Sequence, residues 1–583
     1  MSSIPATQYA VQIVAPDTTA LNTAKPVPEI GPTQILCRIE ATGICFSDTK
    51  LLHAFTAHPR KSEVLTFLTP QELSEIPSYV PGDKPTVPGH EACARVVAVG
   101  SEVKRHKVGD RALVQTDYRH MLTAGSNASF GYNFEGALQQ YVLMDERVII
   151  DPETGERFLI PVSEEPSASA VGLLEPWACV ERAYATEERG TLKAGGRLLV
   201  VTDPGHPIDG VDALMSIAAP ASLTAVTDDE MQRVTLDMLG AAAAVEVAHV
   251  EGLGSLEPGS FDDIIYFGSD ADRVEQLQRL LGLRGVIDVV LGGERLGRPV
   301  EIDVGRVHYD LTRWVGTTGT SAADGYSWVP ASGELRPGEK VGIIGAAGPM
   351  GFMHIVRALT SGVEGVAVTA VDIDAARLAH LASVAEPLAA DRGLAFEWLD
   401  SRERQPDGGF TRVGCMVPVP AVAAGTVELA AQGAVIDFFA GFAIGTTVPL
   451  DLDAMLDRHI YILGTSGSMI SDMKAVLGRL EAGTLDTNIS VYAVSGMQGV
   501  ADALEAVKAR TSGGKIVIYP QLTQLGMVTL AEMGERYPAV AAALDEGRWT
   551  RAAEEALIAG AGGSGGAGGA VAGGSDDAGG AVA

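Results

Sequence analysis

The chain has 583 residues, and its 74 Asp and Glu outnumber its 43 Lys and Arg, leaving a formal net charge of −31. This excess of negative charge argues against binding to nucleic acid or to an anionic membrane surface. There is no run of about 18 apolar residues and no basic segment followed by an apolar core, so neither a transmembrane helix nor a secretory signal is expected. Five scattered cysteines fit a reducing compartment better than a disulfide framework, and we expect a cytoplasmic protein.

The first 150 residues are rich in short runs that favour β-strands. Such runs occupy residues 35–43, 93–100 and 138–150, and turns such as Val87-Pro88-Gly89 separate them. Many short strands with turns between them are typical of a barrel-like β domain.

From about residue 190, strand-like apolar runs alternate with helix-length segments, which predicts a parallel sheet. This texture occurs twice. The segment GTTGT at 316–320 matches GTSGS at 464–468, and residues 285–288 match 433–437 at the same spacing. Two matches that share one spacing indicate an internal duplication of a unit of about 145 residues, the size of a full domain.

The chain after the second unit returns to strand and turn chemistry at residues 507–519. Residues 521–558 read as an amphipathic helical segment. From Ala559 to Ala583 nearly every residue is Gly, Ala, Ser or Asp. We expect this tail to be disordered, because it has too little apolar bulk to offset the entropy of ordering.

Zinc-type ligands occur in short motifs that lie far apart in the chain. Cys45 follows a predicted strand, His90 and Glu91 follow a Pro-Gly turn, and Glu175 opens a predicted helix. Zinc favours thiolate, imidazole and carboxylate ligands, and a catalytic site uses three of them and keeps one position open. Glu91 and Glu175 compete for the third position, and both could bind at different coordination states. Each residue alone also has an ordinary structural role, such as a small core cysteine.

Two polar residues next to Cys45 are candidate catalytic residues. Ser47 could relay a proton from a metal-bound alcohol, or it could be a solvent-exposed serine. Asp48 could accept the second ring N–H of His90 and fix its tautomer, or it could cap the helix that follows. We count Glu91 with this catalytic pair as well as with the metal ligands.

A glycine turn lies between a predicted strand and a predicted helix of the second unit, in the sequence GAAGPMG at 345–351. Backbone N–H groups at such a turn and at the helix N-terminus can bind a pyrophosphate. The pattern departs from a strict G-x-G-x-x-G because Ala stands at 346, and any tight strand–helix turn could produce it. The expected cofactor-binding residues are Gly345, Gly348, Pro349, Met350, Gly351, Asp372 and Arg377.

Asp372 ends the next predicted strand. A carboxylate there binds the ribose hydroxyls and repels a 2′-phosphate, which favours NAD over NADP; alternatively, Asp372 caps the following helix. At the matching positions the first unit has Asp203-Pro204-Gly205-His206 and Thr227. We therefore expect the first unit to keep the sheet without binding a dinucleotide.

Together and in this order, these motifs resemble those of the zinc-dependent medium-chain dehydrogenases, the alcohol and polyol dehydrogenase family. The resemblance covers about residues 1–190 and 335–520. It implies a GroES-like catalytic β domain, and hydride transfer between a zinc-bound alcohol or carbonyl and a nicotinamide. On this analogy Cys45, His90 and Glu175 bind zinc, with Glu91 as the alternate ligand. Further marks of the family are Gly100, Val108-Gly109-Asp110-Arg111, Glu175-Pro176 and Gly514-Lys515-Ile516-Val517.

The chain also departs from the family pattern. Residues 111–136 contain no cysteine, so we expect one catalytic zinc and no structural zinc. This absence and a glutamate at 175 are similar to the sorbitol dehydrogenase and sorbose-1-phosphate reductase branch. The long segment between Asp48 and His90 carries cations that could hold a substrate phosphate or lie in a solvated loop. These are Lys50, His53, His58, Arg60 and Lys61, and residues 132–135 (Tyr-Asn-Phe-Glu) are candidate pocket residues.

The expected fold is α/β plus β, with a GroES-like catalytic β domain and two tandem Rossmann-like doubly wound units, the first degenerate. The expected parts are the catalytic domain at 1–190, the degenerate unit at 191–334, the NAD-binding unit at 335–485, a return to the catalytic domain at 486–520, a helical segment at 521–558 and the tail at 559–583.

The leading functional hypothesis is an NAD- and zinc-dependent oxidoreductase acting on a small molecule: a polyol, a sugar phosphate, or a secondary alcohol or ketone. The alternatives are a zinc-free quinone or enoyl reductase of the same superfamily and a non-catalytic assembly protein. A homo-oligomer is possible. We also hypothesise that the first α/β unit mimics the neighbouring subunit that single-copy relatives recruit through their sheet edges.

Overall fold

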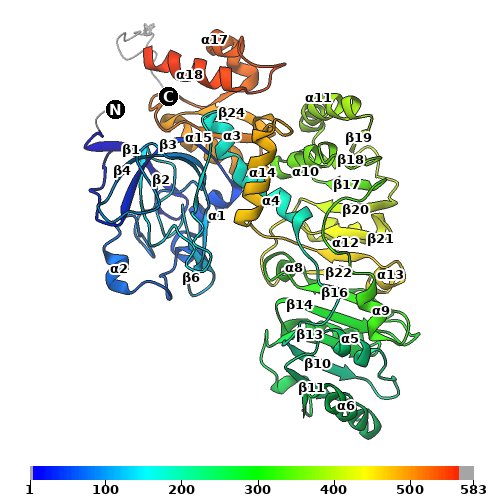
Figure 1. Ribbon diagram of the computed structural model, residues 1–583. Helices are drawn as coiled ribbons and strands as arrows, with labels where there is room; N and C mark the ends of the chain where they lie inside the picture. Colours follow the sequence, from blue (N-terminus) through cyan, green and yellow to red (C-terminus); the bar gives the residue numbers. More distant parts are fainter. Residues whose placement is uncertain (1–3, 564–583) are drawn as a thin grey trace, which may run out of the picture.

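A β-rich domain lies beside an elongated α/β column in the computed structural model, which describes residues 4–563 (Figure 1). The domain is built on an eight-stranded sheet of order β26-β24-β25-β3-β4-β5-β9, with β8 also paired to β3. Its strands come from both ends of the chain: β3 Gln34–Gly43, β4 Glu91–Val99, β5 Arg111–Val114, β8 Tyr141–Asp145, β9 Leu159–Pro161, β24 Val491–Ser495, β25 Lys515–Ile518 and β26 Val528–Thr529.

Shorter elements complete this domain around the sheet. Two further antiparallel pairs flank it, β1 (Thr7–Ala15) with β2 (Thr18–Pro26), and β6 (Asp117–Leu122) with β7 (Asn127–Ser129). The segment between Asp48 and His90 contains short helices joined by irregular chain. These helices are α1 Phe46–Ala54, η1 Phe55–Ala57, η2 Pro59–Lys61 and α2 Pro70–Ser74.

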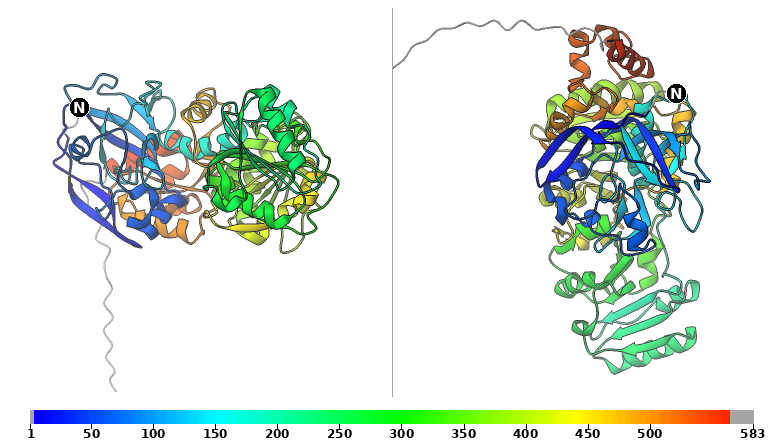
Figure 2. Two further views of the ribbon diagram at one scale, coloured as in Figure 1. Left: turned by 90° about the horizontal axis from the view of Figure 1, so that it is seen from below. Right: turned by 90° about the vertical axis from the view of Figure 1, so that its left-hand side faces the viewer.

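The α/β column contains one continuous sheet of twelve strands, whose order is β12-β11-β10-β13-β14-β16-β23-β21-β20-β17-β18-β19. Numbered within its own unit, each half has the strand order 3-2-1-4-5-6 of a dinucleotide-binding fold. The duplication is therefore confirmed as two doubly wound units. In Figure 2 the first unit projects away from the β-rich domain.

The first unit comprises β10 Arg197–Thr202, α5 Val211–Ile217, β11 Ser222–Val226, α6 Glu230–Ala243, β12 Glu246–His249, η3 Leu253–Ser255, β13 Phe261–Phe267, α7 Ala271–Leu277, η4 Gln278–Leu280, β14 Leu281–Val290, β15 Val300–Asp303, α8 Val304–Tyr309, β16 Arg313–Thr317 and α9 Ala322–Ser327. The second comprises β17 Lys340–Ile344, α10 Pro349–Leu359, β18 Ala367–Asp372, α11 Ala375–Arg392, β19 Ala395–Asp400, β20 Phe410–Cys415, α12 Pro420–Leu429, β21 Ala430–Asp437, β22 Thr447–Leu450, α13 Leu452–Asp457, β23 Tyr461–Leu463 and α14 Ile470–Glu481.

The two units meet through their sixth strands. β16 pairs antiparallel with β23 at Trp314 and Ile462, and β15 pairs antiparallel with β22 over four residue pairs from Val300 to Asp303. Trp314 and Ile462 belong to one buried apolar cluster that also contains side chains from the centres of both units. The joint is thus held by a shared core as well as by strand pairing, and the outer edge of β23 is covered.

Helices α3 (Ala168–Gly172) and α4 (Leu174–Ala185) connect the β-rich domain to the column, and α4 packs against α14. The chain returns to the β-rich domain through η5 (Thr487–Ser490) and β24, followed by η6 (Met497–Gly499), α15 (Val500–Lys508) and β25.

The segment after residue 520 is less uniformly helical than expected. It contains β26 and then η7 Leu530–Glu532, α16 Met533–Arg536, α17 Pro538–Ala541 and α18 Arg551–Gly563. The expectation of disorder from residue 559 is wrong for 559–563, which continue α18. Alanine favours helix, and Glu554 anchors α18 by accepting hydrogen bonds from the backbone of Ala168 and Ser169. The rest of the tail lies outside the described residues.

Within residues 4–563, no helix is long and apolar enough for a membrane crossing.

Candidate active site

Cys45 is positioned by the start of α1. It is the N-cap residue of this helix, and its backbone N–H donates to the carboxylate of Asp48 at 2.9 Å. If Asp48 were the N-cap, the helix would begin at residue 49. It begins one turn earlier, at Phe46. Asp48 instead occupies the third helical position and caps from inside the first turn, which fixes the backbone at Cys45.

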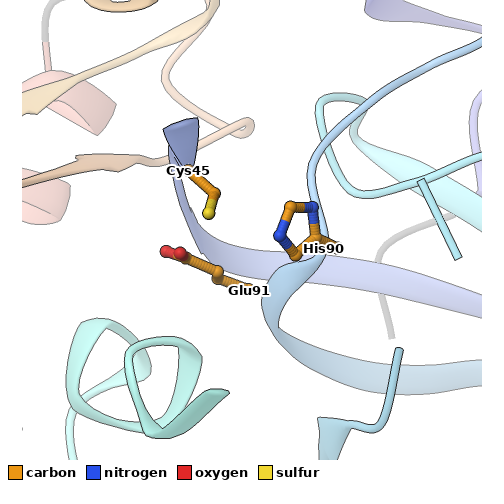
Figure 3. Close-up of side chains that lie close together, drawn as sticks. All are labelled: Cys45, His90 and Glu91. Atoms are coloured by element: carbon orange, nitrogen blue, oxygen red, sulfur yellow. The ribbon is translucent and has the colours of Figure 1, made fainter. Parts of the chain in front are cut away.

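Three ligand-type side chains converge at this point, as Figure 3 shows. The Sγ of Cys45, a ring nitrogen of His90 and a carboxylate oxygen of Glu91 all lie within 4.8 Å of one another. His90 and Glu91 are buried, and Glu91 is the first residue of β4. A thiolate, an imidazole and a carboxylate at these separations fit a divalent ion such as zinc.

The carboxylate of Glu91 has one oxygen engaged and one free. Lys515 donates to Oε1 at 2.5 Å, whereas the buried Oε2 has no hydrogen-bond partner. Buried polar atoms in native proteins are normally satisfied, so an orphaned carboxylate oxygen beside a thiol and an imidazole fits a metal ligand. Gly43 makes room for it, because a Cβ at that position would lie 1.9 Å from Oε2.

His90 is oriented by Asp48. Oδ1 of Asp48 lies 3.2 Å from Nδ1 of His90 and also accepts the backbone N–H of Gly89 at 3.1 Å. Burial lowers the pKa of the imidazole, but the Asp48 carboxylate outweighs it and raises that pKa well above its ordinary value. With Nδ1 directed at Asp48, Nε2 faces the other way, and the hydroxyl of Ser47 lies 3.1 Å from it.

Glu175 is not part of this group of three. It lies in the first turn of α4, where the thiol of Cys179 donates to its Oε1 at 3.5 Å. Burial raises the pKa of Glu175 to about 7, and the neighbouring Glu91 carboxylate adds to the shift while His90 opposes it. Glu175 therefore lies near the candidate metal ligands without joining them.

The candidate pocket residues 132–135 point in different directions. Only Tyr132 approaches the site, with its ring 5.7 Å from that of His90. Asn133 bonds to the backbone at Ser129, Phe134 packs against Tyr118, and Glu135 pairs with Lys25. For these three residues the expectation is wrong, because their side chains serve the β-rich core.

The cations of the segment after Asp48 are not equivalent. Lys61 is fully buried and donates to the backbone of Val80 and Lys84, and His53 pairs with Asp17 away from the site. Arg60 pairs with Asp117 at 2.7 Å and lies over the Tyr132 ring. A solvated loop is therefore the wrong description for Lys61 and Arg60.

The glycine turn of the second unit has the shape that a dinucleotide needs. Gly345 has a φ of +84°, and a Cβ at Gly351 would lie 2.4 Å from the Gly345 carbonyl oxygen, so the helix packs directly on the turn. Gly348 is the N-cap of α10, with Pro349 and Met350 in its first turn and partly exposed. This leaves backbone N–H groups at the helix N-terminus free for an anion.

Asp372 does not cap the following helix, because Asp374 is the N-cap of α11. Its carboxylate instead accepts from the backbone N–H of Ala347 in the glycine turn at 2.9 Å. Arg377 donates through Nε to Asp374 at 3.0 Å, and its NH2 lies 3.9 Å from Asp372. Asp372 thus links the turn to the end of β18.

In the first unit, a glutamine of α6 bonds across the turn that corresponds to the glycine turn. The side-chain amide of Gln232 donates to the carbonyls of Asp203 at 3.0 Å and His206 at 2.8 Å. Its oxygen accepts from the hydroxyls of Thr202 and Thr227. The helix that follows this turn, α5, begins only at Val211.

Two features near the site were not expected. Lys515 was identified only as part of a family motif, and its bond to Glu91 depends on β25 pairing with β3 at Val517 and Gly43. Tyr309, from the first unit, has its hydroxyl 3.5 Å from Nζ of Lys50. No sequence signal marked Tyr309, since the contact exists only once the two units have joined.

Comparison with known proteins places the chain among dehydrogenases. The family model for the alcohol dehydrogenase GroES-like domain matches residues 31–153. The uncharacterized protein YggP of Escherichia coli (strain K12) is 28% identical over 352 residues, which cover 55% of this chain and 76% of that protein. Mannitol-1-phosphate 5-dehydrogenase of Aliivibrio fischeri is 24% identical over 336 residues, covering 53% and 75%. The crystal structure of 2R,3R-butanediol dehydrogenase from Bacillus subtilis is 14% identical with a TM-score of 0.48, covering 88% of this chain and 100% of that one.

The chain combines a GroES-like domain with two Rossmann-like α/β units. The match over residues 31–153 and the similarity to polyol and sugar-alcohol dehydrogenases support a dehydrogenase of the alcohol or polyol type.

Proposed function

We propose that this protein is a zinc- and NAD-dependent dehydrogenase that interconverts a secondary alcohol of a polyol or sugar phosphate with the corresponding ketone. The observation that carries the proposal is the buried group of Cys45, His90 and Glu91, with an oxygen of Glu91 left unsatisfied. The mannitol-1-phosphate relative supports a sugar or sugar-phosphate substrate.

Cys45, His90 and Glu91 would hold the zinc ion. Glu175 would lie near them without binding the ion, and at neutral pH its carboxyl is close to its pKa of about 7. When bound, zinc supplies Lewis acidity toward the substrate oxygen, and NAD supplies the hydride acceptor. Asp48 holds His90 in the orientation a ligand needs, and Ser47 places a hydroxyl where it can take the alcohol proton.

The second unit would bind the dinucleotide and the first would not. Gly345, Gly348, Pro349, Met350 and Gly351 leave the N-terminus of α10 open to the pyrophosphate. Asp372 and Arg377 would meet the adenosine ribose, with Asp372 favouring NAD over NADP. The five cysteines form no disulfide, which supports a reducing compartment such as the cytoplasm.

The two alternative functions make different demands on the site. A zinc-free reductase has no use for a thiol, an imidazole and a carboxylate gathered in one buried group, so the group of three favours the zinc enzyme. A non-catalytic assembly protein does not need an open helix N-terminus beside a glycine turn.

Metal analysis together with a substrate screen tests the proposal. We expect about one zinc per chain, and NADH formation on addition of polyols or sugar phosphates. Cys45→Ala should lose both zinc and turnover while keeping its circular dichroism spectrum. Cys37→Ala, at a buried position on β3, is the control that should keep zinc. NAD binding without any zinc would favour the zinc-free reductase, and neither ligand would favour the assembly protein.

A further inference from the structure

Three segments of the chain, one from each domain, converge beside the candidate active site. Nζ of Lys50, on α1, lies 3.5 Å from the hydroxyl of Tyr309, on α8 of the first unit. A Cβ at Gly441, in the second unit, would lie 3.0 Å from that hydroxyl, 3.1 Å from Nζ of Lys50 and 3.8 Å from Nε2 of His308. Lys50, His308 and Tyr309 are hereafter called the Lys50 subsite.

This subsite shares helix α1 with the residues around the candidate metal ligands. Ser47 and Lys50 are three residues apart on α1 and therefore lie on one face of the helix. Tyr132, whose ring lies beside that of His90, has Arg60 over its ring at 5.4 Å and the His58 ring at 5.1 Å. Burial lowers the pKa of the Arg60 guanidinium, but the Asp117 carboxylate raises it above its usual value, with smaller contributions from Tyr132, Glu175 and Tyr309.

The three side chains offer a defined set of donors and acceptors. Within residues 4–563, the Lys50 ammonium contacts the Tyr309 hydroxyl and the Phe46 ring and forms no ion pair. Nδ1 of His308 lies 3.2 Å from the carbonyl of Phe438, which can only accept, so Nδ1 carries the proton and Nε2 presents a lone pair. An unneutralised cation, a phenol and an imidazole acceptor suit an oxyanion that has a hydroxyl group next to it.

We propose that the first α/β unit contributes directly to substrate binding. Tyr309 and His308 complete, with Lys50, a subsite for an oxyanion at the end of the substrate remote from the oxidised carbon. This rests on the proposed function, and it assigns the otherwise unexplained unit a role in specificity. The oxyanion is a phosphate ester or a carboxylate, which share the chemistry that Lys50 and Tyr309 recognise.

The test compares three substrates on the zinc- and NAD-supplied full chain: a polyol, its terminal phosphate and a sugar acid of the same length. Lys50→Met and Tyr309→Phe should lower the ratio of kcat/KM between the anionic substrate and the free polyol, by about 10- to 100-fold and about 3- to 10-fold respectively. The loss should lie in KM. Lys107→Met, at an exposed lysine away from the site, should leave the ratio unchanged. The phosphate and sugar-acid arms decide which oxyanion is the natural one.

A second readout separates this inference from the proposed function. Binding of inorganic phosphate, measured by calorimetry, should be weaker in Lys50→Met than in the wild type. Any phosphate that binds at the glycine turn does so in both proteins, so it does not contribute to the difference in binding between them. A wild type that oxidises none of the three substrates would overturn the proposed function, whereas phosphate binding would still report on the subsite. Equal losses on all three substrates, or identical phosphate binding in both proteins, would overturn the subsite itself.

Discussion

Glu91 and Glu175 are both buried glutamates near Cys45, but their surroundings give them different roles. Glu91 has an unsatisfied oxygen held in the space above Gly43, whereas Glu175 accepts a thiol hydrogen bond and has its pKa raised to about 7, chiefly by burial. We predict that Glu91→Gln weakens zinc binding by about 100-fold or more, while Glu175→Gln keeps about one zinc per chain. Competition with a chelator of known affinity measures both values, and the opposite ranking would make Glu175 the ligand.

Asp437, at the end of β21, should make stability depend on pH. Burial raises the pKa of its carboxyl to about 7, from 3.8 in an exposed setting. Between these values the unfolded chain is ionised there and the folded chain is not, so this residue costs stability as the pH rises from about 4 to about 7. The cost reaches about 4 kcal/mol at the top of this window.

Asp437→Asn should remove this cost, so the midpoint of thermal unfolding should rise relative to wild type as the pH goes from 5 to 7. Asp374→Asn is the matched control. The backbone and the side chain of Arg377 hold the pKa of Asp374 below its usual value, so that residue is ionised in both states across this range. A difference between wild type and Asp437→Asn that is constant with pH would contradict the prediction.

How far the sequence predicts the site depends on which contacts are local. Cys45, Ser47 and Asp48 share one helix start, so their proximity follows from the motif. The preference for Glu91 over Glu175 was not predictable, because it depends on the space above Gly43 and on Lys515, which reaches Glu91 from the other end of the chain. Tyr309 was also missed, because its contact with Lys50 joins residues that lie 259 positions apart in the chain.

At the scale of the elements, the two strand–turn–helix segments of the column differ in one decisive way. In the second unit, Gly351 brings α10 onto the turn that begins at Gly345. In the first, Gln232 bridges Asp203 and His206 across the corresponding turn. The two units therefore share a strand order, but the turn after the first strand is open in the second unit and closed in the first.

We predict that the chain binds one NADH and not two, because only the open turn leaves helix N–H groups for the pyrophosphate. Gly351→Val should weaken NADH binding at least about 10-fold, since its side chain collides with the Gly345 carbonyl. Fluorescence titration or calorimetry gives both the affinity and the number of sites. Gly252→Val, at an extended glycine of the first unit with open space around it, is the control. Two sites per chain, or equal losses in both variants, would contradict this assignment.

The elements themselves were largely predictable. Alternating apolar runs and the repeated GTTGT and GTSGS segments predicted both α/β units, and the structure confirms the fold class. What could not be predicted was their union into one sheet, since a single residue pair, Trp314 with Ile462, joins the sixth strands. The short β15–β22 pairing and apolar packing make up the rest of the joint. The end of α18 was also placed too early, because the glycines from Gly560 do not stop an alanine-rich helix that is already anchored.

For the whole molecule, the joint between the units removes a surface that could otherwise pair with another chain. β23 is bonded on both sides, so the edges left to the twelve-stranded sheet are β12 and β19. We predict that the protein does not dimerise through β23. Small-angle scattering coupled to size-exclusion chromatography tests this, and a dimer whose envelope places the second units edge to edge would contradict it.

The β-rich domain has a sheet that begins near one end of the chain and is finished near the other. Cys45, His90 and Glu91 emerge from the ribosome early, but Lys515, which lies 424 residues beyond Glu91, must be synthesised before it can hold that carboxylate. At the usual rates of translation this interval is on the order of 20–80 s. Throughout it, Cys45, His90 and Glu91 lie on an unfinished sheet. On the proposed function, metal binding would therefore be completed late in the synthesis of each chain. A product truncated before β25 would carry the donor atoms without the Lys515 bond to Glu91.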